Sequence, residues 1–192
     1  MSKRLLFLAC LALLPACSQT EQEVPPAPAP KAATVDPAQA ARDQAAAEAH
    51  RLRASWIYQD VTVDEGIQHS ASIYSRTLPV EEGEIGPTPD AQLVLRDHPS
   101  WGRSAYLLLA ESKFACGKPC AMKIAFDDGE ARKFSGKQAD SGKGPALFIE
   151  DETKFIAALK QAKQIRIVLP KGSGLVTTLT FEVGGYDASR YH

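Results

Sequence analysis

The sequence predicts a mainly β protein: an antiparallel β-sandwich with one short helix, preceded by a signal peptide, a proline-rich tether and an alanine-rich helix. Short segments of alternating apolar and polar residues recur between residues 56 and 183, which is the pattern of strands with one buried face. Turn-forming residues separate these segments. One helical pattern interrupts them, ahead of the last two strands. About nine strands in roughly 130 residues are enough to enclose a core.

The first 16 of the 192 residues have the pattern of a secretory signal peptide. Lys3 and Arg4 form a positive start, and residues 5–14 form an apolar run. This run is too short to span a bilayer as a permanent helix, but its length suits a signal peptide.

Residues 14–17, Leu-Pro-Ala-Cys, resemble the bacterial lipobox, in which the final cysteine becomes lipidated. The predicted lipid anchor is therefore Cys17, and its acyl chains would hold the protein on a membrane. Cys10 is a competing candidate, but it would leave too short an apolar run. Ser18 rather than aspartate follows the anchor, which predicts the outer membrane, with the protein on its periplasmic side. The alternative is ordinary cleavage nearby, which would leave a soluble periplasmic protein.

Residues 17–35 are expected to form the lipidated cysteine and an extended tether, because prolines and alanines dominate residues 24–30. Asp36 and Pro37 then provide a helix cap and a first helical residue. The alanine-rich stretch that follows predicts a helix over residues 36–55. Its apolar face consists mostly of alanine, which favours a solvated spacer; self-association or docking along a partner is the alternative.

The β domain is predicted to occupy residues 56–192. Its first half contains strands at 56–63, 67–76, 91–96 and 103–110, with a hairpin turn at 64–66 and a loop at 78–90. Residues 113–134 then predict a hairpin. Met122, Ile124 and Phe126 alternate with Ala121, Lys123 and Ala125. The turn is placed at residues 127–129, where Gly129 would accept a positive φ, and the return strand begins at Arg132.

The second half starts with a loop predicted at residues 135–144 because of its Gly, Ser and Lys content. A short strand follows at 146–149. Asp151 is the expected cap of a helix that runs to about residue 162, with Phe155, Ile156 and Leu159 on one face. The last two strands are predicted at 165–169 and 177–183, with a turn at 170–174 between them.

Cys116 and Cys120 are expected to form a disulfide, since the periplasm is oxidising and the other two cysteines lie in the signal peptide and at the lipid site. The bond would fix the start of a strand. A redox pair is the alternative, although three residues rather than two separate the cysteines and no thioredoxin-like pattern surrounds them. A metal site is disfavoured because no further Cys or His lies nearby.

No other side chains form a recognisable catalytic set. His69 and His98 are far apart in sequence, and Ser70 does not lie in a nucleophile-elbow motif. Asp127 and Asp128 are adjacent carboxylates best explained by turn formation. Four basic residues near the second helix could face acidic lipid or a partner, although a solvated face is the simpler interpretation: Lys160, Lys163, Arg166 and Lys171. The 22 basic and 23 acidic residues nearly balance, so nothing points to nucleic acid.

Residues 56–186 resemble periplasmic β-sandwich proteins, notably the type VI secretion-associated accessory family and the invasion-associated locus B proteins. Four segments carry the resemblance: 93–96 (LVLR), 126–129 (FDDG), 155–167, and 179–185 (LTFEVGG). The resemblance implies an envelope accessory protein that works by binding. The lipid anchor and the alanine-rich helix depart from it.

The sequence thus predicts a non-enzymatic, lipid-anchored binding or accessory protein of the cell envelope, such as a secretion-system factor. The expected partners are the membrane, through Cys17, and an envelope or secretion protein; no cofactor is expected. The alternative is an inhibitor or immunity lipoprotein that plugs a cell-wall hydrolase with residues 78–90 or 135–144. An enzyme using His69, or Cys116 and Cys120, is a third hypothesis.

Overall fold

The computed structural model describes residues 36–76, 90–109, 116–139, 146–172 and 175–191. The predicted signal peptide, the lipid site at Cys17 and the tether lie outside these residues. In the part that is described, nine strands and two helices follow one another, with a 3-10 turn at Ala188–Arg190. The helices are α1 (Pro37–Ala54) and α2 (Glu152–Leu159). The strands are β1 (Ile57–Val63), β2 (Gly66–Tyr74), β3 (Ala91–His98), β4 (Gly102–Leu109), β5 (Cys120–Phe126), β6 (Arg132–Gln138), β7 (Ala146–Ile149), β8 (Ile165–Gly172) and β9 (Leu175–Phe181).

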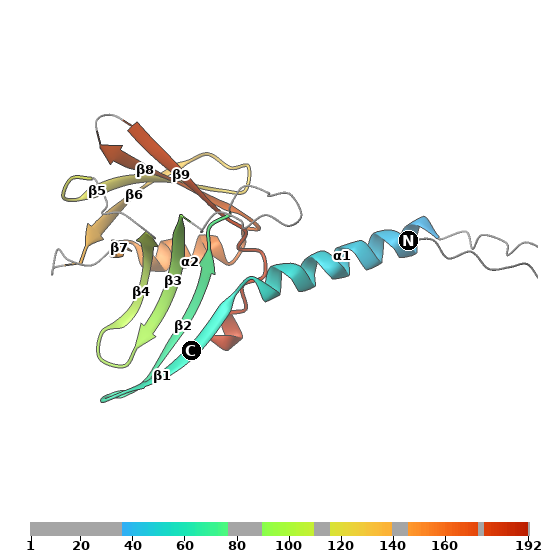
Figure 1. Ribbon diagram of the computed structural model, residues 1–192, viewed down its shortest axis with the longest axis horizontal. Coiled ribbons are helices and arrows are strands. Elements are labelled where there is room, and N and C mark those ends of the chain that lie inside the picture. Colours follow the sequence, from blue (N-terminus) through green and yellow to red (C-terminus); the bar gives the residue numbers. More distant parts are fainter. Residues whose placement is uncertain (1–35, 77–89, 110–115, 140–145, 173–174, 192) are drawn as a thin grey trace, which may run out of the picture. The chain divides into compact units, whose positions relative to one another are not determined.

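The nine strands form one open sheet in the order β1-β2-β3-β4-β7-β6-β5-β8-β9. Every neighbouring pair is antiparallel, which confirms the predicted mainly β, antiparallel fold. The two layers belong to a single continuous sheet: Figure 1 shows β1 to β4 in one layer and β5, β6, β8 and β9 in the other.

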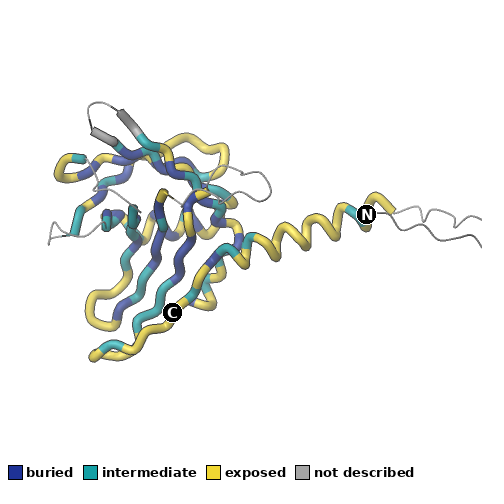
Figure 2. Tube along the Cα trace, in the orientation of Figure 1, coloured by how far each residue is buried: buried dark blue, intermediate teal, exposed yellow. Residues whose placement is uncertain are grey.

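The sheet encloses one hydrophobic core, to which both layers contribute. Leu93 and Leu107 come from the first layer, and Ile124 and Ile167 from the second; none of the four is exposed to solvent. Helix α2 adds Phe155, Ile156 and Leu159, the residues predicted to share one helical face, to the same cluster. Figure 2 shows this buried set along the central strands. Because side chains alternate along a strand, each strand has an inner face toward this core and an outer face away from it.

Helix α1 begins as predicted, with the Asp36 side chain accepting a hydrogen bond from the Ala38 amide. None of its residues is buried. Its last turn nevertheless contacts the β domain, because Arg51 pairs with Glu182 and Leu52 packs against Gly185. Neither α1 nor any other helix among the described residues is long and apolar enough to cross a membrane.

The structure corrects the loop predicted at residues 135–144, because strand β6 continues to Gln138. Ser135, Gly136 and Lys137, which contributed to the loop prediction, are strand residues, whereas residues 140–144 lie outside the described set. Gly136 is buried, and a Cβ atom at this position would collide with the Met122 side chain. A larger residue would have to displace the end of the Met122 side chain and press against Leu147, so packing against the core favours glycine. The turn predicted at 170–174 is also shorter, because β8 extends to Gly172.

The turn between β5 and β6 lies where it is predicted, but its left-handed residue is different. Asp127, not Gly129, has a positive φ of 50°. Its carboxylate Oδ1 accepts hydrogen bonds from the amides of Lys163 (2.8 Å) and Gln164 (2.9 Å). Aspartate tolerates the left-handed region because its short polar side chain can bond nearby backbone groups. Asp127 therefore ties the turn to the segment that leads into β8.

Candidate functional site

The outer face of β5, β6 and β8 forms the candidate site. Along β5, Met122 and Ile124 point to the core, so Ala121, Lys123 and Ala125 point outward. The strand register places β6 on one side of β5 and β8 on the other. Three segments that are distant in sequence thus present one surface.

Two lysines lie directly opposite each other on this surface. Lys123 of β5 pairs in register with Lys133 of β6, and both are exposed. On its other side, Lys123 is in register with Val168 of β8. Like charges directly opposite on adjacent strands destabilise a sheet. A pair of this kind is therefore unfavourable for folding and is suited to an external anion.

A shallow groove of about 400 Å³ lies between these side chains. It is mostly apolar, and its lining includes outward residues from all three strands: Ala121, Lys123, Lys133, Ser135, Val168 and Pro170. Lysine stems add hydrocarbon to the walls while the ammonium groups reach solvent. We call this surface the basic groove. Its volume is in the range of small-ligand sites, and it would also accept side chains of a peptide segment.

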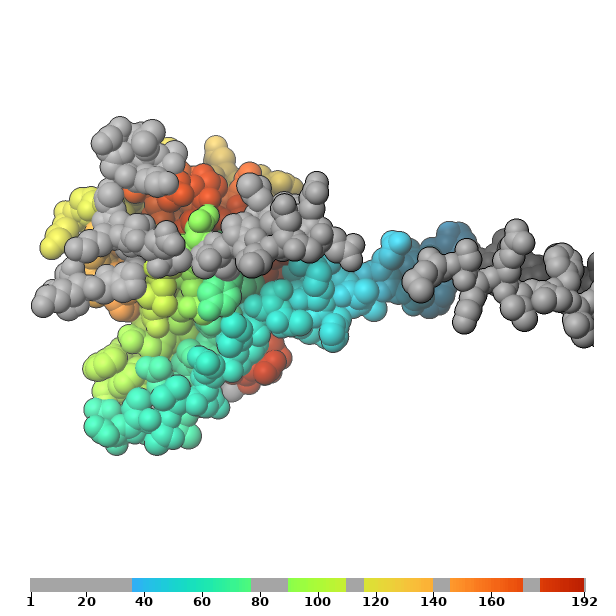
Figure 3. Space-filling view, in the orientation of Figure 1, coloured from blue at the N-terminus to red at the C-terminus, as the bar shows by residue number. Residues whose placement is uncertain are grey.

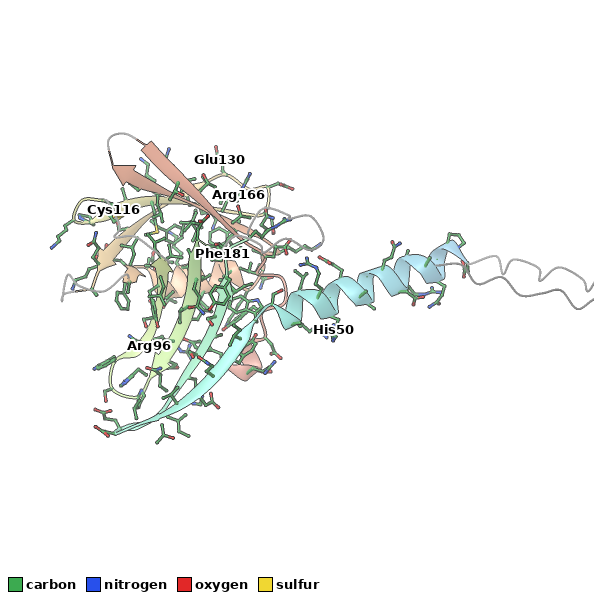
Figure 4. All side chains as sticks on the ribbon, in the orientation of Figure 1. His50, Arg96, Cys116, Glu130, Arg166 and Phe181 are labelled. Atoms are coloured by element: carbon green, nitrogen blue, oxygen red, sulfur yellow. A yellow bond between two sulfur atoms is a disulfide. The ribbon has the colours of Figure 1, made fainter. Side chains whose placement is uncertain are left out.

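Among the strand residues whose side chains the structure describes, the charges at outward positions have one sign. Within the strands, the outward positions carry five basic residues and no acidic one: Arg96, Lys123, Lys133, Lys137 and Arg166. The two acidic strand residues, Asp60 and Asp97, occupy inner-face positions. Lys123, Lys133 and Arg166 form no ion pair with any residue that the structure describes. Arg166 lies on β8 in the upper layer of Figure 4.

This arrangement favours a partner that combines negative charge with apolar groups. An anion between Lys123 and Lys133 would offset their mutual repulsion. Apolar atoms of the same partner would cover Val168 and the lysine stems. This burial would strengthen binding by about 25 cal/mol per Å² of apolar surface removed from water. Charge complementarity of this kind contributes mainly to the rate and specificity of association.

The cysteines predicted as a pair lie at the start of β5. Cys116 and Cys120 form a disulfide in the structure, with an S–S distance of 2.05 Å. Cys120 is fully buried, and the next residue, Ala121, lines the basic groove. The bond therefore constrains one end of the groove.

The structure separates the residues considered for a catalytic triad. His69 Nδ1 lies 2.8 Å from Asp60 Oδ1. Ser70, the next residue, points to the opposite face, and its hydroxyl donates to the carbonyl of Gln59. His98 is buried on β3 and stacks on Trp101. His69 and Ser70 are thus not brought together for nucleophilic chemistry.

The basic patch predicted near the second helix is assembled differently. Lys160 and Lys163 are exposed beyond the end of α2, and the side chain of Lys171 lies outside the described set. Arg166 instead shares the outer face with Lys123 and Lys133. Sequence analysis missed these lysines, although the turn at 127–129 centres the hairpin on Asp128 and so pairs them.

Two further predictions concern sites that the structure describes only in part. No cluster of His, Cys, Asp or Glu that could hold a metal ion occurs in the described part of the chain. The inhibitor hypothesis relied on loops at 78–90 and 135–144. Most of these residues lie outside the described ranges, and 135–138 belong to β6.

Comparisons with known proteins give little beyond the fold. No family model and no curated protein matches the sequence. Among solved structures, invasion associated protein B from Bartonella henselae is similar with a TM-score of 0.45 and 11% sequence identity. The similarity covers 70% of this chain and 87% of that protein. It is a weak resemblance of fold.

Proposed function

We propose that the chain is a non-enzymatic, lipid-anchored binding protein of the cell envelope. Its basic groove would hold an acidic, partly apolar segment of an envelope protein, such as a component of a secretion system. The observation that carries the proposal is the Lys123–Lys133 pair: like charges face each other across two strands, above an apolar surface, without a carboxylate among the described residues to neutralise them.

The anchor at Cys17 would keep this groove close to the membrane, and the following tether would set how far it reaches. Replacing Cys17→Ala should abolish fatty-acid labelling and release the protein into the soluble fraction. Unchanged labelling would show that the anchor lies elsewhere. The test is independent of the groove, because Cys17 precedes the folded domain in sequence.

A capture experiment tests the groove. Full-length protein would be used as bait in solubilised envelope extract, and bound proteins would be identified by mass spectrometry. The test variant carries Lys123→Glu and Lys133→Glu. The control carries Lys160→Glu and Lys163→Glu, which change the net charge equally but lie beyond the end of α2 and do not line the groove.

The proposal predicts that wild type and control capture the same envelope protein and that the groove variant loses it. Capture should also weaken as salt rises, because exposed charges are screened. If the groove variant captures the same protein as wild type, the basic groove is not the binding site.

A further inference from the structure

A second basic group, distant from the basic groove, is held in a fixed position on the outer face of β3. The Arg96 guanidinium carbon lies 5.2 Å from the ring centre of Trp101, 5.5 Å from that of Tyr106 and 5.9 Å from that of Phe148. Its Nε donates a hydrogen bond to the Ser104 hydroxyl at 3.2 Å. Three rings and one hydrogen bond thus orient a partly buried cation.

Most donors of this guanidinium have no hydrogen-bond acceptor among the residues that the structure describes. Arginine has five N–H groups, and the bond to Ser104 uses one. No carboxylate of the described residues pairs with Arg96, and the adjacent Asp97 pairs instead with Arg103 (3.1 Å) on the other face. A pre-oriented guanidinium with two terminal nitrogens available fits a carboxylate in a bidentate geometry.

Beside Arg96, Trp101 presents an exposed aromatic surface. It lies in the turn between β3 and β4 and is 70% exposed. One side of the ring stacks on His98, with ring centres 3.9 Å apart and planes 12° apart. His98 is itself buried, and its Nδ1 accepts a hydrogen bond from the Ser100 amide. This support orients Trp101 before any ligand arrives. In Figure 3 the turn that carries it projects beside the β1–β2 hairpin.

Serines flank Arg96 on the outer face. Ser70 of β2 and Ser104 of β4 are in register with Arg96 on either side. Two residue pairs farther along, Ser72 accepts a hydrogen bond from the Gln92 side-chain amide and is in register with the apolar Val94. A polyhydroxylated ligand is matched by hydroxyl and amide side chains beside an aromatic plane.

We propose that Arg96 and Trp101 form a binding site for a carboxylate-bearing carbohydrate. The carboxylate accepts hydrogen bonds from the terminal nitrogens of Arg96. The C–H face of the sugar ring packs on the exposed side of Trp101, and sugar hydroxyls reach Ser70 and Ser104. This site lies on the third strand of the sheet order, whereas the basic groove lies on the sixth to eighth, and the two are independent.

Oligogalacturonate serves as the probe, with full-length protein as the receptor. The methyl-esterified oligosaccharide keeps the sugar and removes the charge, and polyglutamate keeps the carboxylates and removes the sugar. The chain has two tryptophans, and Trp56 is buried. Binding can therefore be followed as protection of Trp101 fluorescence from iodide quenching.

The proposal predicts that oligogalacturonate binds and protects Trp101, while the ester and polyglutamate bind about tenfold more weakly or not at all. Arg96→Lys retains the positive charge but cannot form a bidentate pair with a carboxylate. Trp101→Ala removes the aromatic surface on which the sugar packs. Each substitution should weaken binding about tenfold. The groove variant with Lys123→Glu and Lys133→Glu should bind as wild type does. No binding of oligogalacturonate, or equal binding of polyglutamate, would overturn the assignment, and loss in the groove variant would show that the two sites are not independent.

Discussion

Lys123 and Lys133 face each other directly across β5 and β6, in a hairpin whose turn is centred on Asp128. In this position they repel each other, and the strands gain nothing from their charges. The basic groove is thus a place where sequence favours binding over stability. Trade-offs of this kind are common at functional sites.

Lys133→Glu should raise stability and abolish capture at the same time. An opposite-charge pair with Lys123 would replace the repulsion, which should raise the free energy of unfolding by roughly 0.5 kcal/mol. Urea denaturation measures the first effect and envelope capture the second. A variant that is less stable than wild type would contradict the proposed repulsion between the two ammonium groups.

Asp127→Ala should destabilise the domain by about 1–2 kcal/mol. The change removes the acceptor for two amides, those of Lys163 and Gln164, and leaves alanine in a left-handed backbone conformation. Asp128→Ala is the matched control, since the neighbouring carboxylate accepts no such bonds from the described residues and should change stability by less than about 0.5 kcal/mol. Equal effects of the two substitutions would refute the role assigned to Asp127.

Gly185→Ala should detach the last turn of α1 from the β domain. A Cβ atom at this position would overlap the backbone of Leu52 and Arg53, which cannot move aside as a flexible side chain can. Amide hydrogen exchange should accelerate in the last turn of α1 while β3 and β4 remain protected. Gly117→Ala is the control, because its nearest neighbour would be an ordinary contact with Pro119. Unchanged exchange in α1 would mean that the helix is not held by this contact.

Ionisation of two buried tyrosines should lower the stability of the domain at alkaline pH. The hydroxyls of Tyr186 and Tyr191 are buried without a hydrogen-bond partner among the described residues. Burial raises the pKa of Tyr186 to about 12 and the pKa of Tyr191 further above its usual range. In the unfolded chain both tyrosines ionise near pH 10. Burial of the two neutral hydroxyl groups therefore makes its full contribution to the free energy of unfolding below pH 10, and this contribution is lost as the pH rises toward 12.

Denaturation at several pH values tests this prediction. The denaturant concentration at the unfolding midpoint should decrease as the pH is raised from 10 to 12. Tyr191→Phe should make this decrease smaller, since phenylalanine cannot ionise. Tyr74→Phe is the control because Tyr74 is exposed on β2. If neither substitution changes how the unfolding midpoint depends on pH, the result would contradict the buried state of Tyr191.

Most strands and helices could be predicted from the sequence, but the order in which the strands pair in the sheet could not. Alternation along β5, around Met122 and Ile124, identifies a strand because burial on one face imposes a period of two. The start of the predicted loop proves to be strand β6, because Ser135 and Gly136 are typical of loops and only close packing against Met122 and Leu147 explains why a glycine suits the strand there. Local patterns do not contain such tertiary contacts.

The candidate sites depend on the same non-local contacts. Lys123 meets Val168 because β8 pairs with β5, although residues 127–164, which include β6, β7 and α2, separate the two strands in sequence. The Arg96 guanidinium is positioned by three aromatic rings, which come from the β3–β4 turn, β4 and β7. Neither relationship follows from spacing. The Lys123–Lys133 pair is the exception, because the hairpin turn alone sets its register.

The measurement that tests the basic groove most directly is lysine labelling within the native envelope. Membranes containing the full-length protein and the purified protein in detergent would be treated with the same amine-reactive reagent, and each lysine would be quantified by mass spectrometry. Lys160 and Lys163 provide the internal reference, since both are exposed and neither lines the groove. If a partner occupies the groove, Lys123 and Lys133 will react several-fold more slowly in membranes while the reference lysines are unchanged. Equal reactivity of all four lysines in both preparations would contradict the proposed binding site.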